Sequence, residues 1–266
     1  MAVDQGAKPI RFAVLTPNEG STEIIDRPII AEAPIALDYN GIGYAVMMAT
    51  PIDLQDYAVG FSLSEGLITH PDDILAIDTH QSELGWILRI QVPQENAEKV
   101  VARARQRVSE SSCGLCGMDN LEEVMRPLPP VTAQIAVADA AIFAALSALR
   151  SQQTLNAITR SAHAAAFCAP DGAILMTRED VGRHNALDKL IGALANAHID
   201  ISAGFIVLTA RCSLELVQKT ILANCPMLVT ISAATDLAIN IAQKSGLRLI
   251  SLARADSALA AMPRND

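Results

Sequence analysis

Short apolar segments and amphipathic segments alternate through the second half of this 266-residue chain. Runs rich in Val, Ile and Leu predict strands, and stretches with apolar residues at helical spacing predict helices between them. Strands that alternate with helices favour a parallel sheet covered on both faces. The predicted strands are 205–209, 227–231 and 247–252, and the predicted helices are 185–197, 214–223 and 237–244. We therefore expect an α/β core over residues 131–266, which begins with an alanine-rich helix at 133–149 and a hairpin at 164–177.

The first half predicts a smaller α+β part over residues 27–130. A turn at Asn40-Gly41 separates two strands, and Thr50 with Pro51 predicts a helix start, with the helix ending near Gly66. Further strands are expected at 73–78 and 86–92, and a charged amphipathic helix is expected at 94–108. The N-terminus, at 1–26, is expected to be flexible. Residues 109–130 lack apolar periodicity, and a loop of that length inside a compact domain is usually functional or disordered.

Composition and charge narrow the class of protein. The chain is 51% hydrophobic but only 3% aromatic, so its core is aliphatic. A net charge of −9 argues against nucleic acid or an anionic membrane surface as the main partner. No apolar run reaches the ~18 residues that span a bilayer, and the first residues lack the order of a signal peptide. We expect a cytoplasmic protein without membrane insertion.

Five cysteines without an export signal predict reduced thiols rather than a disulfide framework. Three of them lie among apolar residues and are predicted to be buried thiols: Cys168, Cys212 and Cys225. Cys113 and Cys116 differ, because two residues separate them and glycine follows each. That spacing is compatible with half of a zinc site, a redox motif or sulfur handling. Their place in the long loop argues against a rigid zinc knuckle.

A second polar constellation, REDVGRHNALDK at 178–189, lies where a strand end meets a helix start. Ligands of open α/β sheets bind at the carboxyl ends of strands, and helix N-termini attract anions. Polar residues after the other strands reach the same edge and predict a pocket there. The alternative is a solvated helix start held by salt bridges. The candidates for phosphate contacts and directional hydrogen bonds are Arg178, Arg183, His184, Asn185 and Lys189, with His163, Arg211, Ser213, Ser232, Thr235 and Arg254 at neighbouring strand ends.

The two constellations together resemble the FdhD family of sulfur-transfer accessory proteins of molybdenum formate dehydrogenases. The matching segments are TPIDLQDYAVGFSLSEG from Thr50, SCGLCG from Ser112 and REDVGRHNALDK from Arg178, with weaker matches in RCSLELVQK from Arg211 and SAATDLA from Ser232. The resemblance extends over residues 27–255. The combination of SCGLCG with REDVGRHNALDK is far more specific than a CxxC motif alone.

The resemblance implies a sulfurtransferase. A cysteine desulfurase would load Cys113 with persulfide sulfur, Cys116 would assist, and the sulfur would pass to the molybdenum of the bis(molybdopterin guanine dinucleotide) cofactor before its insertion into the formate dehydrogenase apoenzyme. It also implies a homodimer, a core similar to that of cytidine deaminase, and no resident metal. The residues expected to contact the cofactor are His163, Arg178, Arg183, His184, Asn185, Lys189, Arg211, Ser213, Leu252, Ala253, Arg254, Ala255, Asp256 and Ser257.

The sequence departs from the family pattern at several positions. Arg160 and Ser161 stand where the family has a glycine pair, Ala210 replaces a glycine, and Ala234 replaces a proline. One alternative function is a chaperone that binds the cofactor and has a structural or zinc-binding CxxC. Another alternative, suggested by the similar fold, is a zinc-dependent deaminase. That class of enzyme requires the motifs His-x-Glu and Pro-Cys-x-x-Cys. Neither motif is present here, because Ala164-Ala165 follows His163 and Ser112 precedes Cys113.

Overall fold

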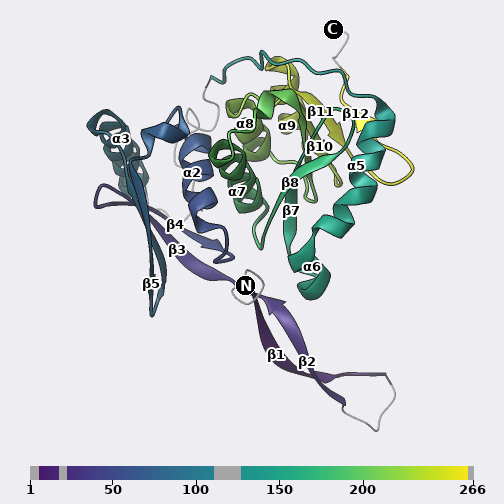
Figure 1. Cartoon of the computed structure of the whole chain (residues 1–266), viewed down its shortest axis with the longest axis horizontal. Helices are drawn as coiled ribbons and strands as arrows, with labels where there is room; N and C mark the ends of the chain where they lie inside the picture. Colours follow the sequence, from purple (N-terminus) through teal and green to yellow (C-terminus); the bar gives the residue numbers. More distant parts are fainter. Residues whose placement is uncertain (1–5, 18–22, 111–126, 263–266) are drawn as a thin grey trace.

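The structure is a computed structural model that describes residues 6–17, 23–110 and 127–262. Three sheets organise it: a two-stranded hairpin, a four-stranded sheet in the first half and a six-stranded sheet in the second half (Figure 1). Over these residues, no helix is long and apolar enough to cross a membrane.

The four-stranded sheet has the order β4-β3-β6-β5 and packs one face against helices α2 and α3. Its elements are β3 (Ala33–Tyr39), β4 (Ile42–Ala49), α2 (Leu54–Ser64), the short 3₁₀ helix η1 (Pro71–Asp73), β5 (Ala76–Ser82), β6 (Gly85–Gln91) and α3 (Gln94–Glu110). The predicted turn is confirmed, since Asn40 and Gly41 both have positive φ, as a tight two-residue hairpin requires. The predicted strand at 73–78 lies later, because 71–73 forms η1.

The predicted helix start at Thr50 is wrong, since α2 begins three residues beyond Pro51, at Leu54. Thr50 does not cap the helix. Its hydroxyl instead accepts a hydrogen bond from the Val181 backbone N–H, and its own N–H donates to Asp180 Oδ2 at 3.0 Å. A residue predicted to act locally therefore joins the two halves of the chain.

The six-stranded sheet has the order β12-β11-β10-β9-β7-β8. Its strands are β7 (His163–Cys168), β8 (Ile174–Asp180), β9 (Phe205–Leu208), β10 (Met227–Thr230), β11 (Arg248–Ser251) and β12 (Leu259–Ala260). The α/β class is confirmed, but the sheet is mixed. Strands β9, β10 and β11 are parallel, whereas β7 runs antiparallel to both of its neighbours and β12 runs antiparallel to β11.

Helices cover both faces of this sheet (Figure 1). The helices and the 3₁₀ turn of this half are α5 (Asp139–Gln152), α6 (Thr154–Thr159), α7 (Arg183–Asn196), η3 (Ile201–Ala203), α8 (Leu214–Leu222) and α9 (Asp236–Lys244). Alternate residues of β9 show the two layers: Ile206 and Leu208 belong to the cluster with α7 and α8, and Phe205 and Val207 to the cluster with α5.

Helices α2 and α7 cross at two glycines and join the first half to the second. A Cβ atom built on Gly60 would lie 1.7 Å from the Asp188 carbonyl oxygen, and one built on Gly192 would lie 1.9 Å from the Asp56 carbonyl oxygen. Only glycine permits this approach.

After the cysteine-bearing segment, the chain lies on the core of the second half, where Val131 N–H donates to the Ser245 carbonyl. The division at residue 130 stays a prediction.

The sequence did not predict the N-terminal hairpin. Strands β1 (Ala7–Val14) and β2 (Glu23–Ile30) pair antiparallel over their whole length. All of β1 and the first half of β2 lie within residues 1–26, which were expected to be flexible. The hairpin projects from the body of the molecule (Figure 1).

Candidate functional site at the strand-end edge

Cys113 and Cys116 lie outside the described residues, which end at Glu110 and resume at Pro127. Their expected roles stay predictions. The other three cysteines are free and buried, as predicted. Burial raises the pKa of the Cys168, Cys212 and Cys225 thiols to about 12, so none supplies a thiolate near neutral pH. Among residues 6–17, 23–110 and 127–262, no group of three His, Cys, Asp or Glu side chains could hold a metal ion.

Several predicted site residues meet at one edge of the six-stranded sheet, here called the strand-end edge. It comprises the start of β7, the start of α7, and the segments that follow β9, β10 and β11. Backbone contacts hold these segments together: Cys212 pairs with Ala234, and Leu252 N–H donates to the Ser232 carbonyl. The predicted residues at this edge are His163, Arg183, His184, Arg211, Ser213, Leu252, Ala253, Arg254, Ala255, Asp256 and Ser257.

His163 is half-buried at the first position of β7, opposite Asp180 in the β7–β8 pair. Burial and the nearby Arg183 guanidinium lower the pKa of His163 below its usual range. The imidazole is therefore neutral at pH 7 and hydrogen-bonds the Thr209 backbone. A neutral ring beside an arginine serves as a hydrogen-bonding group rather than a second cation.

His184 forms a compact cluster with the start of α8. Its Nε2 lies 2.7 Å from Glu215 Oε2 and 3.4 Å from Ser213 Oγ. The hydrogen bond from His184 lowers the pKa of Glu215, so this carboxyl is ionised at neutral pH. Sequence reasoning missed Glu215, although its place two residues after Ser213, at a helix start, could have indicated it.

Arg183 has a hydrogen-bond donor, its Nε–H, that is available to a ligand at the strand-end edge. Among the described residues, its buried Nε has no hydrogen-bond partner. A buried donor without an acceptor is costly and rare in folded proteins. In addition, Gly182 caps α7 without a side-chain hydrogen bond, so no side chain competes for the first N–H groups of that helix. Both features suit an anion that approaches the start of α7.

The segment after β11 forms an exposed turn at the edge. Arg254 N–H donates to the Ser257 carbonyl at 2.8 Å, and Ser257 Oγ lies 3.3 Å from Asp256 Oδ1. Ala253 is buried beneath the turn and donates its N–H to the Thr230 carbonyl. The turn therefore exposes the Arg254 side chain and anchors its backbone on β10.

Three predicted cofactor contacts do not lie at the strand-end edge. Arg178 Nη2 contacts Asp56 Oδ2 at 2.8 Å, Asn185 Nδ2 donates to Asp180 Oδ1 at 3.0 Å, and the Lys189 side chain is completely buried. All three face α2 and the first half of the chain. Their expected contact with the cofactor stays a prediction, and in the structure protein groups hydrogen-bond their charged and amide atoms.

Asp180 is the centre of this buried cluster. Its carboxylate accepts hydrogen bonds from the Thr50 and Gly182 N–H groups, Asn185 Nδ2 and Lys189 Nζ, the last at 2.6 Å. The neighbouring Glu179 also has partners within the protein. It accepts from the first N–H groups of α6. Much of REDVGRHNALDK is therefore structural.

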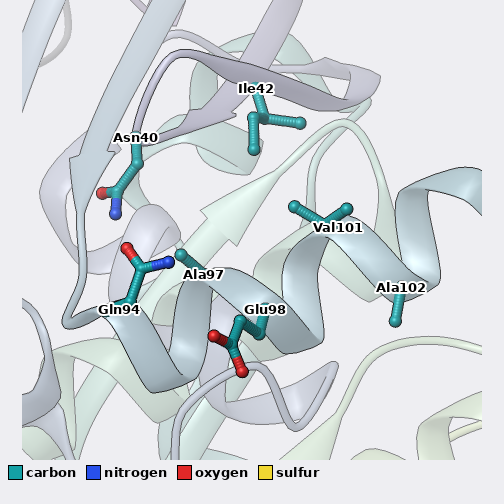
Figure 2. Close-up of a pocket in the computed structure, with 7 residues that line it drawn as sticks. All are labelled: Asn40, Ile42, Gln94, Ala97, Glu98, Val101 and Ala102. Carbon is teal, nitrogen blue, oxygen red and sulfur yellow. The ribbon is translucent and has the colours of Figure 1, made fainter.

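Two cavities lie away from the strand-end edge, and no predicted site residue lines either. One, of about 360 Å³, lies between the Asn40 turn and α3, where Gln94 and Glu98 face it (Figure 2). The other, of about 350 Å³, lies between the end of α2 and helices α7 and α8, and its lining includes Lys219. Lys219 Nζ is paired with both carboxylate oxygens of Asp188 at 2.8 Å.

Comparison with known proteins decides the family. The profile of the FdhD/NarQ family matches residues 30–260. The chain belongs to the FdhD/NarQ family. Among curated proteins it is similar to "Sulfur carrier protein FdhD" of Variovorax paradoxus (43% identical over 86% of this chain and 82% of that protein) and of Xanthomonas campestris pv. campestris (45%, over 88% and 84%).

A solved structure shares the fold of this chain. The "Crystal structure of a putative formate dehydrogenase accessory protein from Desulfotalea psychrophila" aligns with a TM-score of 0.74. The alignment covers 96% of both chains at 20% identity. The same arrangement of sheets therefore persists where most side chains differ.

The structure also locates the departures from the FdhD pattern. Arg160 closes α6 with φ of 57°, a left-handed conformation that glycine adopts most easily. The arginine thus retains the backbone shape that a glycine would provide. Ala210 is buried between β9 and Arg211, so it adds only a methyl group beneath the edge.

Proposed function

We propose that this FdhD-family protein is a sulfur carrier. It accepts persulfide sulfur from a cysteine desulfurase on Cys113 and delivers it to the molybdenum of the bis(molybdopterin guanine dinucleotide) cofactor, for use by a formate dehydrogenase apoenzyme. The observation that carries the proposal is identity of 43–45% with sulfur carrier proteins over 86–88% of the chain. The SCGLCG segment and the basic strand-end edge support it.

Loading is a thiol exchange. The Cys113 thiolate attacks the terminal sulfur of the donor persulfide, a new S–S bond forms, and the donor cysteine leaves as a thiolate. For delivery, the Cys116 thiolate attacks the Cys113 sulfur and releases hydrosulfide to the molybdenum. The product is a Cys113–Cys116 disulfide, which a cellular dithiol reduces before the next cycle.

The strand-end edge suits the guanine dinucleotide arms of this cargo. Arg183 offers a buried donor without a partner among the described residues, and Arg211 and Arg254 are exposed on the segments that follow β9 and β11. His163 and Ser213 add neutral hydrogen-bonding groups. We propose that these residues bind phosphate and ribose oxygens, and that Arg178, Asn185 and Lys189 only support the fold.

Sulfur loading is tested by intact mass after incubation with a desulfurase, cysteine and pyridoxal phosphate. Wild type should gain about 32 Da, one sulfur atom. Cys113→Ala should gain nothing, whereas Cys116→Ala should keep the adduct because Cys116 acts only in delivery. Ser112→Ala is the neighbouring control. An adduct that persists in Cys113→Ala would sink the proposal, and stoichiometric zinc without any adduct would favour the chaperone alternative.

Cargo binding is tested separately with GDP, a fragment of the cofactor, by calorimetry. Arg183→Ala should weaken GDP binding about tenfold or more, as loss of a charge-assisted hydrogen bond does. Arg150→Ala, an exposed arginine on α5, should leave affinity unchanged. Equal affinities for both variants would place the dinucleotide elsewhere.

A further inference from the structure

The second cavity of the structure, here called the three-helix cavity, lies between the end of α2 and helices α7 and α8. These helices lie side by side, so the cavity belongs to the joint between the two halves of the chain (Figure 1). Its volume of about 350 Å³ lies at the lower end of the range for small-molecule sites. Most of its lining is aliphatic and includes Leu63, Ile68, Ile191, Leu194, Ile201 and Leu222. Ile201 and Leu222 are half-buried and Thr69 is exposed, so the cavity opens to solvent.

Of the described residues that line the cavity, Lys219 alone is charged. Its Nζ lies 2.8 Å from each carboxylate oxygen of Asp188 and 5.7 Å from the centre of the Phe61 ring, so the ammonium is held in place. An ammonium has three N–H groups, and two of them meet Asp188. The third has no hydrogen-bond partner among the described residues. Burial raises the pKa of Asp188, and the Lys219 ammonium and the nearby Ser64 hydroxyl oppose that effect.

Ser64, the last residue of α2, brings a second donor to the cavity wall. The residue is 3% exposed, and its buried Oγ forms no hydrogen bond of normal geometry with any described residue, Asp188 included. Ser62 on the same helix shows the usual arrangement, since its Oγ donates to the Ala58 carbonyl at 2.6 Å. Buried hydroxyls nearly always have a partner in folded proteins. The missing acceptor for Ser64 is therefore expected inside the cavity.

We propose that the three-helix cavity binds a small neutral molecule with an apolar body and one hydrogen-bond acceptor, such as a ketone or amide oxygen. The body packs on the aliphatic side chains of α7 and α8, and the acceptor receives the third N–H of Lys219 and the O–H of Ser64. A purely apolar molecule would leave both donors unpaired. An anion would meet the carboxylates of Asp188 and Glu65, which already act on each other. The lining residues of α7 lie in its last two turns, away from the strand-end edge, so the site is independent of sulfur transfer.

Saturation-transfer NMR on the full chain tests the proposal with three probes of similar size: acetophenone, ethylbenzene and benzoate. Acetophenone carries a neutral acceptor and should bind with a dissociation constant of about 1 mM or tighter. Ethylbenzene lacks the acceptor, and benzoate adds a negative charge. Both should bind at least about fivefold more weakly, which is the effect of one hydrogen bond. No binding of acetophenone, or equal or tighter binding of either other probe, would overturn the proposal.

Variants locate the probe in the cavity. Ala195→Phe places a ring in the cavity and should abolish acetophenone binding, whereas Ala197→Phe, at an exposed position outside the lining, should leave it unchanged. Ser64→Ala should weaken acetophenone binding about fivefold and leave ethylbenzene binding unchanged, a difference that general loss of structure would not produce. Binding that survives in Ala195→Phe, or a Ser64→Ala effect on both probes alike, would also overturn the proposal. Cys113→Ala should bind acetophenone like wild type, so failure of sulfur loading and failure of this site are distinguishable.

Discussion

Replacing Lys189 with methionine separates a structural role from a cofactor-binding role. Lys189 Nζ is completely buried, 2.6 Å from Asp180 Oδ2 and 2.8 Å from the Thr50 carbonyl oxygen. Burial lowers the pKa of Lys189, and the Asp180 carboxylate opposes that effect. Methionine keeps most of the side-chain volume and removes the cation. The substitution therefore leaves Asp180 buried without its only cationic partner among the described residues.

The loss in unfolding free energy depends on the partners that the Asp180 carboxylate keeps in the Lys189→Met variant. Breaking a buried ion pair by removing one partner costs about 3–5 kcal/mol, because an uncompensated charge stays inside the protein. Asp180 keeps hydrogen bonds from the Thr50 and Gly182 N–H groups and from Asn185. Because these bonds remain, we expect a loss at the lower end of that range, about 3 kcal/mol. This loss is a large fraction of typical domain stability.

Urea unfolding at pH 7 measures the loss, and a double variant identifies its cause. Asp180→Asn combined with Lys189→Met removes both charges, so it should be about 1–2 kcal/mol more stable than Lys189→Met alone. GDP affinity of the folded Lys189→Met protein should equal that of wild type. A loss below about 1 kcal/mol together with weakened GDP binding would refute the reasoning and restore Lys189 as a cofactor contact.

Further expectations concern packing, titration and thiol reactivity. Gly60→Ala should lose roughly 1–3 kcal/mol in urea unfolding, since its Cβ meets the Asp188 carbonyl, whereas Gly43→Ala, with open space around it, should lose nothing. Because the pKa of His163 is lowered in the folded state, the unfolding free energy should fall as pH drops below about 6.5, and His163→Gln should flatten that slope. Iodoacetamide at pH 8 should modify at most two thiols of the native protein and all five in denaturant, because Cys168, Cys212 and Cys225 are buried and their pKa values are raised. A third adduct on the native protein would contradict the burial of these thiols.

The sequence predicted most of the second half because its signals are local. Each parallel strand is a short apolar run, and each helix shows its own amphipathic period, so 205–209 and 227–231 match β9 and β10 within one residue. The N-terminal hairpin was not predicted, because its apolar residues face outward and its strands contain Pro9 and Pro28. Prolines and polar residues indicate loops when no partner surface is visible. The mixed direction of the large sheet also depends on pairing that no local pattern encodes.

The site was predicted in part. Residues that follow successive strands do meet at one edge, as the rule for open α/β sheets requires, and this places His163, Ser213 and Arg254 there. The polar residues within α7 and at the end of β8 have partners inside the protein, and their expected contact with the cofactor stays a prediction. A dense polar segment indicates that its residues have partners, but not whether those partners are a ligand or the rest of the chain.

Helical periodicity resolves that ambiguity in α7. Asn185, Lys189 and Gly192 lie at i, i+4 and i+7, so they share one face, and Gly192 marks it as the face that a neighbouring backbone approaches. Polar groups on such a face are enclosed when the helices pack, and they must find partners within the protein. His184 and Asp188 form the adjacent stripe, which meets Glu215 and Lys219 of α8. Arg183 precedes both stripes at the first turn, where the backbone N–H groups are uncapped by side chains. In the proposed function a ligand approaches α7 at its start, and the rest of the motif holds that start in place.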